Sequence, residues 1–502
     1  MRAAEFRGTP DDLLEIDTLS ELTQASARRT DSPDPAGPAP TVLKFGGTSV
    51  ADAGAFERVA TIVRMHGGPR PVVVVSALAG MTDALLASVT TAAQADVGRA
   101  RQSVEGQLDR HREVARRLLA REEAASFDAT VARARREIVE LLERLPTEWE
   151  AQAALRDEVA SHGERLAASL LAATLAAAGL PTRAVDARRC IVTDEAHGQA
   201  TPLAPDTERR TRAELLPLLD GGLVPVLGGY IAAARRGRTT TLGRGGSDYT
   251  AALVGAALRA GEIQIWTDVS GVLTADPRVV PRARPIPRLS YAEAAELAYF
   301  GARVLHPKTI QPAMEQRIPV RICNSRAPED RGTVVTAEPD VQPETVKAIA
   351  HKTGVTVLQI TSTGMLGAYG FLRALFEVFD RYRTVVDVVT TSEVSVSLTL
   401  EDVRSLPQIL GELRPLGDVS VEPERAIVCV VGEGLRTTPG IAARIFTTVR
   451  DINVSLISQG ASRVNLTFVI AEDRVRDAVR RLHEAFFERE PAPVGAAVEP
   501  GG

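Results

Sequence analysis

The feature that most constrains the fold is a series of short apolar runs separated by segments with helical periodicity. The clearest run covers residues 71–76 (PVVVVS), where four consecutive valines leave no polar face. A strand of this kind is buried on both sides, which is typical of a parallel sheet covered by helices. Residues 42–45 form a similar run, and residues 52–65 have the periodicity of a helix. We therefore predict an α/β fold with a mainly parallel sheet between two layers of helices.

A glycine-rich turn follows the first of these strands. Residues 44–50 (KFGGTSV) pass from the strand through a glycine pair into a helix start. Backbone N–H groups at a helix N-terminus bind anions, and glycine lets an anion approach the backbone. Lys44 is one of only four lysines among 59 basic residues, so a compact point charge is retained beside the glycines. An anion site and a plain turn with a solvated lysine are both compatible with this stretch alone.

A second glycine-rich loop covers residues 243–248 (GRGGSD) and leads into another helix. Ser247 or Asp248 is placed to cap that helix. Arg244 lies among three glycines, an arrangement that suits a carboxylate or a phosphate. Because ligands bind at the carboxyl ends of parallel strands, both loops are expected at the same edge of the sheet.

The two loops indicate phosphoryl transfer to a carboxylate. The chain lacks GxxxxGK[ST], and no GxGxxG follows the first strand, which disfavours a P-loop or a dinucleotide fold. Phosphoryl transfer depends mainly on positioning and charge neutralisation, which a lysine and an arginine supply. The sequence shows no obvious general base. A carboxylate acceptor is ionised at pH 7 and needs none, whereas an alcohol acceptor would need one.

Composition excludes several classes of protein. The formal net charge is −5, the pI is about 6.0 and no basic–aromatic stretch is present, so nucleic acid and membranes are not expected partners. Three widely spaced cysteines indicate reduced thiols and a cytoplasmic location. Seven scattered histidines show no zinc-ligand spacing, and we expect no metal bound by the protein alone.

Composition shifts and an internal repeat predict the domain organisation. After about residue 338 two segments resemble each other, and each follows the ferredoxin-like order βαββαβ. Paired units of this size bind a ligand or a partner more often than they carry out chemistry. The predicted segments are a disordered tail and linker at 1–40, a catalytic domain at 41–338 with a helical insert at 91–148, small units at 339–425 and 426–488, and a tail at 489–502.

Six motifs along the chain resemble those of aspartate kinases. Each is weak or moderate alone, but six in this order are specific. The chain therefore resembles a monofunctional aspartate kinase, with an amino-acid-kinase domain, which is an αβα sandwich, and two C-terminal ACT units. The motifs are residues 44–50 (KFGGTSV), 161–164 (SHGE), 243–248 (GRGGSD), 267–269 with 276–278 (TDV and DPR), 300–307 (FGARVLHP), and 386–387 with 391–395 (VD and TSEVS).

The resemblance implies a reaction and roles for individual residues. ATP, accompanied by Mg²⁺, would phosphorylate the side chain of L-aspartate to 4-phospho-L-aspartate, the first step of lysine, threonine and methionine biosynthesis. Lys44 would neutralise the transferred phosphoryl group, and Asp248 would orient Lys44. Glu164 would hold the substrate ammonium, Arg244 a substrate carboxylate, and Thr82 would contact aspartate. The ATP site would comprise Lys44, Gly46, Gly47, Thr48, Ser76, Thr267, Asp268, Arg278, Arg303 and Val304.

The sequence departs from the family's nucleotide site at two positions. Leu273 stands where a tyrosine is common, so an adenine or ribose contact is missing or replaced. Arg303 stands where the family usually has lysine, which keeps the charge but not the geometry.

The paired ACT units imply feedback inhibition by an amino acid bound between the first units of a homodimer. Asp387 and Glu393 suit the ammonium of such an effector. We expect lysine first and threonine second, although Ala368 and Val385 replace polar residues seen in some lysine-sensitive relatives. Candidate contacts are Met365, Gly370, Phe371, Leu372, Val386, Asp387, Thr391, Ser392 and Glu393, of which Met365 and Leu372 also suit ordinary packing.

Two other functions remain open from the sequence. The nearest is another enzyme of the amino-acid-kinase fold, such as a glutamate or nucleotide kinase, which the SHGE and FGARVLHP motifs and the ACT pair disfavour. The other is a catalytically silent amino-acid sensor, which the retention of Lys44, Arg244 and Asp248 disfavours. A fused homoserine dehydrogenase is not expected, because the chain ends soon after the second unit.

Overall fold

The computed structural model describes residues 37–94, 96–145, 149–301, 305, 307–338, 346–367 and 369–488. The predicted tails lie almost wholly outside these ranges, and so do Arg303, Val304 and Ala368. Within the described ranges, no helix is both long and apolar enough to cross a membrane.

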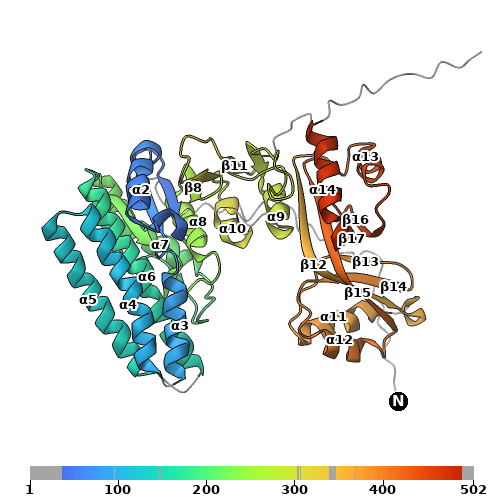
Figure 1. The fold of residues 1–502 in the computed structure, drawn as a ribbon, viewed down its shortest axis with the longest axis horizontal. Coiled ribbons are helices and arrows are strands. Elements are labelled where there is room, and N and C mark those ends of the chain that lie inside the picture. Colours follow the sequence, from blue (N-terminus) through green and yellow to red (C-terminus); the bar gives the residue numbers. More distant parts are fainter. Residues whose placement is uncertain are drawn as a thin grey trace, which may run out of the picture. The chain divides into compact units, whose positions relative to one another are not determined.

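An eight-stranded sheet forms the centre of the N-terminal part (Figure 1). Its paired strands run parallel except where β10 meets β11, as the continuous apolar runs predict. The last two strands at one side of the sheet, β11 and the edge strand β9, are short and were not predicted, because neither contains a distinct apolar run. In spatial order the strands are β3 (Thr182–Val185), β5 (Val224–Gly228), β2 (Pro71–Val75), β1 (Thr41–Phe45), β8 (Glu262–Thr267), β10 (Val320–Asn324), β11 (Thr333–Thr336) and β9 (Arg288–Ser290).

Helices cover both faces of this sheet, which confirms the predicted sandwich. In β2, Val72 and Val74 pack into one apolar cluster while Val73 and Val75 pack into the other, so the strand is buried on both sides. The face of Val73 carries α2 (Ala53–His66), α3 (Met81–Ala93), α4 (Val97–Leu118), α5 (Arg121–Glu143) and α6 (Trp149–Ala177). The opposite face carries α7 (Ala204–Asp220), α8 (Gly246–Leu258), α9 (Tyr291–Tyr299) and α10 (Pro307–Glu315).

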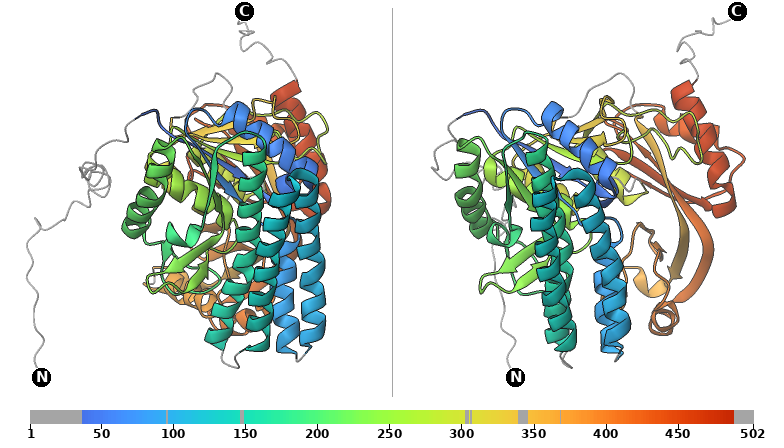
Figure 2. Two further views of the ribbon diagram at one scale, coloured as in Figure 1. Left: turned by 90° about the vertical axis from the view of Figure 1, so that its left-hand side faces the viewer. Right: turned by 60° about the vertical axis from the view of Figure 1, so that its left-hand side comes forward.

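The predicted helical insert forms α4 and α5, which lie beside α3 and α6 (Figures 1 and 2). Its predicted start at residue 91 falls inside the last turn of α3, which continues to Ala93. The insert also touches the SHGE motif, because Nε2 of His162 lies 3.0 Å from Oε2 of Glu137 in α5.

A three-stranded sheet stands beside the main one. It consists of β4 (Val192–Thr193), β6 (Ile231–Ala234) and β7 (Thr239–Thr241), in that spatial order. Only Leu242 separates the end of β7 from the GRGGSD loop, so this small sheet determines where that loop begins.

The C-terminal part is built on a six-stranded antiparallel sheet that contains both predicted ferredoxin-like units (Figure 1). The helices that pack on it are α11 (Phe371–Arg381), α12 (Leu406–Leu413), α13 (Ile441–Thr448) and α14 (Val475–His483). In spatial order its strands are β13 (Val389–Thr391), β14 (Ser395–Leu400), β12 (Ala348–Thr361), β15 (Asp418–Val431), β17 (Asn465–Ala471) and β16 (Val454–Gln459).

The two units share strands β12 and β15, so they are not consecutive segments of the chain. The first half of β12, from Ala348 to Lys352, pairs with Ile427–Val431 and completes the C-terminal unit. The second half, from Thr356 to Thr361, pairs with β14 and with the first half of β15. The boundary predicted between residues 425 and 426 therefore falls inside a continuous strand, because a long strand serves two adjacent units without a break.

Candidate active site

A lysine–aspartate ion pair lies at the carboxyl end of the parallel sheet. Lys44 is the fourth residue of β1, between β2 and β8, and is only 9% exposed. Its Nζ lies 2.6 Å from Oδ1 of Asp248, which comes from the first turn of α8. The two glycine-rich loops thus meet at one edge of the sheet, as the sequence predicts.

Asp248 does not cap α8, and neither does Ser247. The residue before the helix is Gly245, whose φ is +73°, and no side chain accepts a hydrogen bond from the first turn. The capping prediction was therefore wrong. Asp248 lies inside the helix and turns its carboxylate to Lys44 instead. The backbone N–H groups of this helix start are left without a side-chain cap, as an anion-binding helix end requires.

Glycines allow the end of β5 to approach both α6 and α8. A Cβ on Gly229 would lie 2.6 Å from Cβ of Ser247, and a Cβ on Gly228 would lie 2.9 Å from Cβ of Glu164. Ser76, directly after β2, donates to Oγ of Ser247 at 2.9 Å. The ends of β2 and β5, the middle of α6 and the start of α8 therefore form one compact site.

Glu164 projects into this site from α6 and is 3% exposed. Burial raises the pKa of its carboxyl to about 8. Thr82 donates to Oε1 at 3.4 Å, and Oε2 has no hydrogen-bond partner among the described residues. The preceding residue, Gly163, lets α6 approach the loop after β2 closely, since a Cβ there would lie 3.0 Å from Cβ of Ala77. A buried carboxyl with one open oxygen is suited to receive a cationic ligand.

Arg244 stands at the exposed tip of the second loop. Its neighbours Gly243 and Gly245 both have positive φ, at +75° and +73°, which a side chain would strain. Arg244 forms no ion pair with another described residue, and its guanidinium is open to a carboxylate or a phosphate.

Hydroxyls join the ends of β1, β8 and β10 on the other side of Lys44. Oγ of Ser49 lies 2.9 Å from Oγ of Ser325, which donates to the carbonyl oxygen of Thr267 at 3.0 Å. Oγ1 of Thr267 donates to Oδ1 of Asp268 at 3.2 Å. Ser325 was not predicted as a site residue. Its only signal in the sequence is its position directly after a strand of the parallel sheet.

Arg278 does not reach the Lys44–Asp248 pair in the described structure. Its guanidinium binds both oxygens of Asp276, and its side chain is 87% exposed. Burial lowers the pKa of His351 in β12, and the charge of Arg278 contributes to this decrease. The surrounding loop packs with Val280 against the C-terminal ferredoxin-like unit. Arg303 and Val304, the other predicted nucleotide contacts of this region, lie outside the described residues.

Asp387, the main candidate for effector binding, is already engaged. Its side chain is 4% exposed, Nζ of Lys352 lies 3.2 Å from Oδ2, and the hydroxyl of Tyr299 donates to Oδ1. Lys352 also pairs with Glu401 at 2.7 Å. A lysine ammonium of this same chain thus occupies the carboxylate that the sequence assigns to an effector ammonium.

The other effector candidates surround the β13–β14 hairpin and the start of α11. Gly370, with φ of +85°, precedes α11, and Oγ of Ser392 lies 2.7 Å from Oγ of Ser395 in the hairpin turn. Thr391 ends β13 and Glu393 lies exposed in the turn, while Leu372 is 41% exposed. Met365, Phe371 and Val386 pack partly buried against the apolar cluster of this unit.

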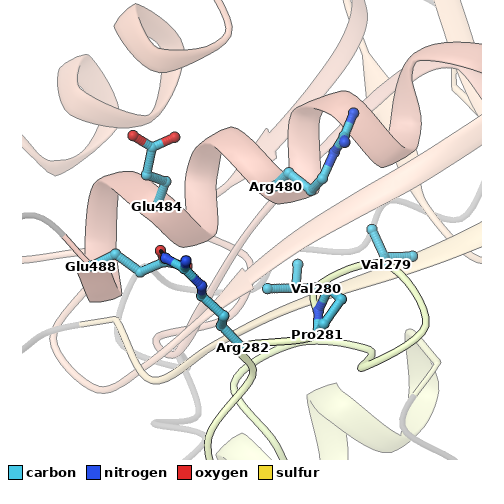
Figure 3. A pocket seen from close by; sticks show the side chains of 7 residues that line it. All are labelled: Val279, Val280, Pro281, Arg282, Arg480, Glu484 and Glu488. Atoms are coloured by element: carbon cyan, nitrogen blue, oxygen red, sulfur yellow. Dashed lines mark hydrogen bonds and ion pairs between the residues drawn. The ribbon is translucent and has the colours of Figure 1, made fainter.

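A separate open pocket lies between the loop after β8 and α14 (Figure 3). Its volume is about 500 Å³, and an ion pair between Arg282 and Glu488 at 3.2 Å spans it. It contains none of the predicted site residues, and its charges of both signs do not point to one ligand. The lining residues are Val279, Val280, Pro281, Arg282, Arg480, Glu484 and Glu488.

Comparison with known proteins agrees with this geometry. Residues 39–324 match the amino acid kinase family, and residues 428–486 match the ACT domain. The lysine-sensitive aspartokinase 3 of Escherichia coli is 38% identical over 460 residues, covering 89% of this chain and 99% of the relative. A crystal structure of E. coli aspartokinase III with aspartate and ADP has a TM-score of 0.75 at 36% identity, over 89% of this chain and 99% of the other. Its complex with lysine and aspartate has a TM-score of 0.76 at 37% identity, with the same coverage.

The parallel sheet, the two glycine-rich loops and the buried lysine–aspartate pair define a phosphotransferase of the amino-acid-kinase class. The ACT units that follow the kinase domain narrow the class further. The chain belongs to the aspartokinase family, and it is an aspartate kinase.

Proposed function

We propose that this site transfers the γ-phosphoryl group of ATP to the side-chain carboxylate of L-aspartate, giving 4-phospho-L-aspartate. The Lys44–Asp248 pair carries this proposal, because it places one buried cation where the two glycine-rich loops meet. Lys44 neutralises charge on the transferred group, and Asp248 holds its ammonium in place. The acceptor is already ionised, so no general base is required.

Glu164, Arg244 and Thr82 form the proposed aspartate site. The oxygen of Glu164 that has no described partner receives the substrate ammonium, and the exposed guanidinium of Arg244 receives a substrate carboxylate. Thr82, which donates to Glu164, lies close enough to contact the same substrate.

The nucleotide lies on the other side of Lys44 in this proposal. Hydroxyl and carboxylate oxygens at the end of β8 suit Mg²⁺, which arrives with ATP as part of the substrate complex. The proposed contacts are Gly46, Gly47, Thr48, Ser76, Thr267, Asp268, Arg278, Arg303 and Val304.

A hydroxylamine-trapping assay tests the reaction directly. Acyl phosphates react with hydroxylamine, so the full-length protein with ATP, Mg²⁺ and L-aspartate is expected to yield aspartyl hydroxamate. L-glutamate in place of aspartate serves as the control for the rival glutamate kinase activity. Hydroxamate from glutamate but not from aspartate would contradict the proposal, and product from neither would favour the amino-acid sensor.

The ACT units are proposed to bind lysine as a feedback inhibitor, with threonine second. The lysine sensitivity and the lysine complex of the E. coli relative support lysine. Binding of an effector ammonium at Asp387 would require displacement of the Lys352 ammonium, which also pairs with Glu401. The proposed contacts are Met365, Gly370, Phe371, Leu372, Val386, Asp387, Thr391, Ser392 and Glu393.

A homodimer through the first ACT unit is also proposed. Most of the large apolar side chains that are exposed among the described residues lie in this unit, and patches of this kind mark interfaces. Burial of the patch against a second copy would remove it from water. The exposed residues are Leu366, Tyr369, Leu372, Phe376, Val385, Val389 and Val403.

The reaction would open the route to lysine, threonine and methionine, and we place it in the cytoplasm. Cys190, Cys323 and Cys429 are buried free thiols, which supports a reducing compartment.

A further inference from the structure

A second buried carboxylate lies on the same helix as Glu164 and has no part in the reaction described above. Asp157 precedes Glu164 in α6 by two helical turns, so both residues face the same side of the helix. Each is 3% exposed. Their hydrogen bonding differs, because Glu164 keeps an open oxygen whereas both oxygens of Asp157 are occupied.

Three donors surround the Asp157 carboxylate. Nδ1 of His197 donates to Oδ2 at 2.9 Å, and the backbone N–H of Gly198 donates to Oδ2 at 3.0 Å. The hydroxyl of Thr241 donates to Oδ1 at 2.6 Å. An ionised carboxylate only accepts hydrogen bonds, so it satisfies all three donors, whereas an amide would turn an N–H toward one of them.

These donors lie on both sides of the loop that carries Arg244. Thr241 is the last residue of β7, and only Leu242 separates it from that loop. Gly243 packs closely against the segment that follows His197, since a Cβ on Gly243 would lie 3.2 Å from Cγ of Gln199 and 3.3 Å from the carbonyl oxygen of Gly198. Asp157 therefore fixes the strand that enters the loop and the segment against which the loop rests.

Tyr230 connects the hydrogen-bonded groups around Asp157 to the proposed aspartate site. Its hydroxyl is hydrogen-bonded to Thr241, and burial, together with the charges of Glu164 and Asp157, raises its pKa to about 12. Tyr230 also has φ of +65°, a conformation that non-glycine residues adopt only when their surroundings hold them in it. Tyr230 is partly buried, and both α6 carboxyl groups lie within electrostatic reach of its hydroxyl.

We infer that Asp157 is a positioning residue for aspartate binding. By holding Thr241 and Gly198 together it sets the backbone from which Arg244 meets a substrate carboxylate. The inference rests on the proposed role of Arg244. It assigns Asp157 to the acceptor substrate, so its loss should affect aspartate and not ATP.

Steady-state kinetics of Asp157→Asn test this assignment. The side-chain amide leaves one donor unsatisfied in a buried site, so the loop loses its fixed position. The KM for aspartate is expected to rise roughly ten-fold or more, while kcat and the KM for ATP stay within about two-fold. Thr241→Val removes a single donor and is expected to shift the aspartate KM in the same direction, which covers the case that Asp157→Asn fails to fold.

Asp194→Asn is the matched control. Oδ1 of Asp194 accepts from the backbone N–H groups of Ala196 and Thr201 in the same segment, but it makes no hydrogen bond to β7. Its aspartate KM should stay within about two-fold of the wild type. An equal rise in Asp194→Asn, or an equal rise in the KM for ATP in Asp157→Asn, would overturn the inference. A wild type that forms no aspartyl phosphate would overturn the proposed function as well, so the two failures are distinguishable.

Discussion

Lys44 illustrates how the fold prepares a single residue for chemistry. Its strand is flanked by β2 and β8, which exclude water from its stem, and Asp248 holds its ammonium at 2.6 Å. An ammonium is a compact point charge, whereas a guanidinium is a wide planar fork.

Two substitutions of Lys44 follow from this geometry. Lys44→Ala is expected to lower kcat roughly a hundred-fold or more, because a preorganised charge at the transferred group is lost. Lys44→Arg keeps the charge but not the shape, so it is expected to lose most of the activity as well. Hydroxamate formation measures both, with circular dichroism as the control for folding. Wild-type turnover in Lys44→Ala would contradict the proposed role of Lys44 in phosphoryl transfer.

The raised pKa of Glu164 predicts that substrate binding is coupled to the release of a proton. Burial raises its pKa to about 8, so the carboxyl is mostly protonated at pH 7 in the free enzyme. A bound ammonium favours the carboxylate, and aspartate binding should therefore release a proton at pH 7. Calorimetric titrations in two buffers of different ionisation enthalpy measure this release. Binding without a buffer dependence in the wild type would contradict it.

The raised pKa of Glu164 also makes the stability of the folded protein depend on pH. The folded state holds the Glu164 proton up to about pH 8, whereas the ordinary pKa of a glutamate carboxyl, which applies in the unfolded chain, is 4.5. The folded state therefore binds more protons between these values, and stability falls as the pH rises through that window. Glutamine cannot ionise, so the Tm of Glu164→Gln should fall less than that of the wild type as the pH rises through this window. An identical pH profile for the variant and the wild type would contradict the assignment.

At the scale of elements, glycines decide how closely strand ends approach helices. Gly229 lets the end of β5 lie against the first turn of α8, because a Cβ there would lie 2.6 Å from Cβ of Ser247. Neither atom belongs to a flexible chain end, so a larger residue must move the helix that carries Asp248. The Lys44–Asp248 distance therefore depends on this glycine.

Gly229→Ala is expected to destabilise the protein by about 1–3 kcal/mol and to lower activity. Gly106→Ala is the matched control, because it lies in α4 with no atom within 4 Å of an added Cβ. It should stabilise by about 0.5–1 kcal/mol and leave activity unchanged. Thermal unfolding and the hydroxamate assay measure both. Equal behaviour of the two variants would show that the contact at Gly229 does not matter.

At the scale of the whole molecule, α9 joins the kinase domain to both ACT units. Glu293 is fully buried and accepts from Nζ of Lys347 and the backbone N–H of Glu433, both at the C-terminal unit. Tyr299, the last residue of α9, donates to Asp387 of the first unit. The hydroxyl of Tyr299 therefore links the C-terminal end of α9 directly to Asp387, the main candidate for effector binding.

Tyr299→Phe tests this link, because it removes the hydroxyl that joins α9 to Asp387. The lysine concentration for half inhibition is expected to rise roughly five-fold or more, with kcat little changed. Tyr382→Phe is the control, since its hydroxyl bonds Glu412 within the first unit and does not touch α9. Unchanged inhibition in Tyr299→Phe, or an equal change in Tyr382→Phe, would contradict a link through this hydroxyl.

The sequence by itself determined the parallel sheet, its two helical layers, the paired small units and the meeting of two glycine-rich loops, because strand period, apolar runs and glycine spacing are local properties. Only the tertiary structure decided that no side chain caps α8, that β12 and β15 are shared by both units, and that Asp387 is held by Lys352 and Tyr299. These outcomes join segments far apart in the chain, and local periodicity contains no information on which distant side chains meet. Glu164 and Asp157 illustrate the same point. Both are acidic residues on one face of α6, but Glu164 has an oxygen without a described hydrogen-bond partner, whereas both oxygens of Asp157 accept hydrogen bonds from other parts of the fold.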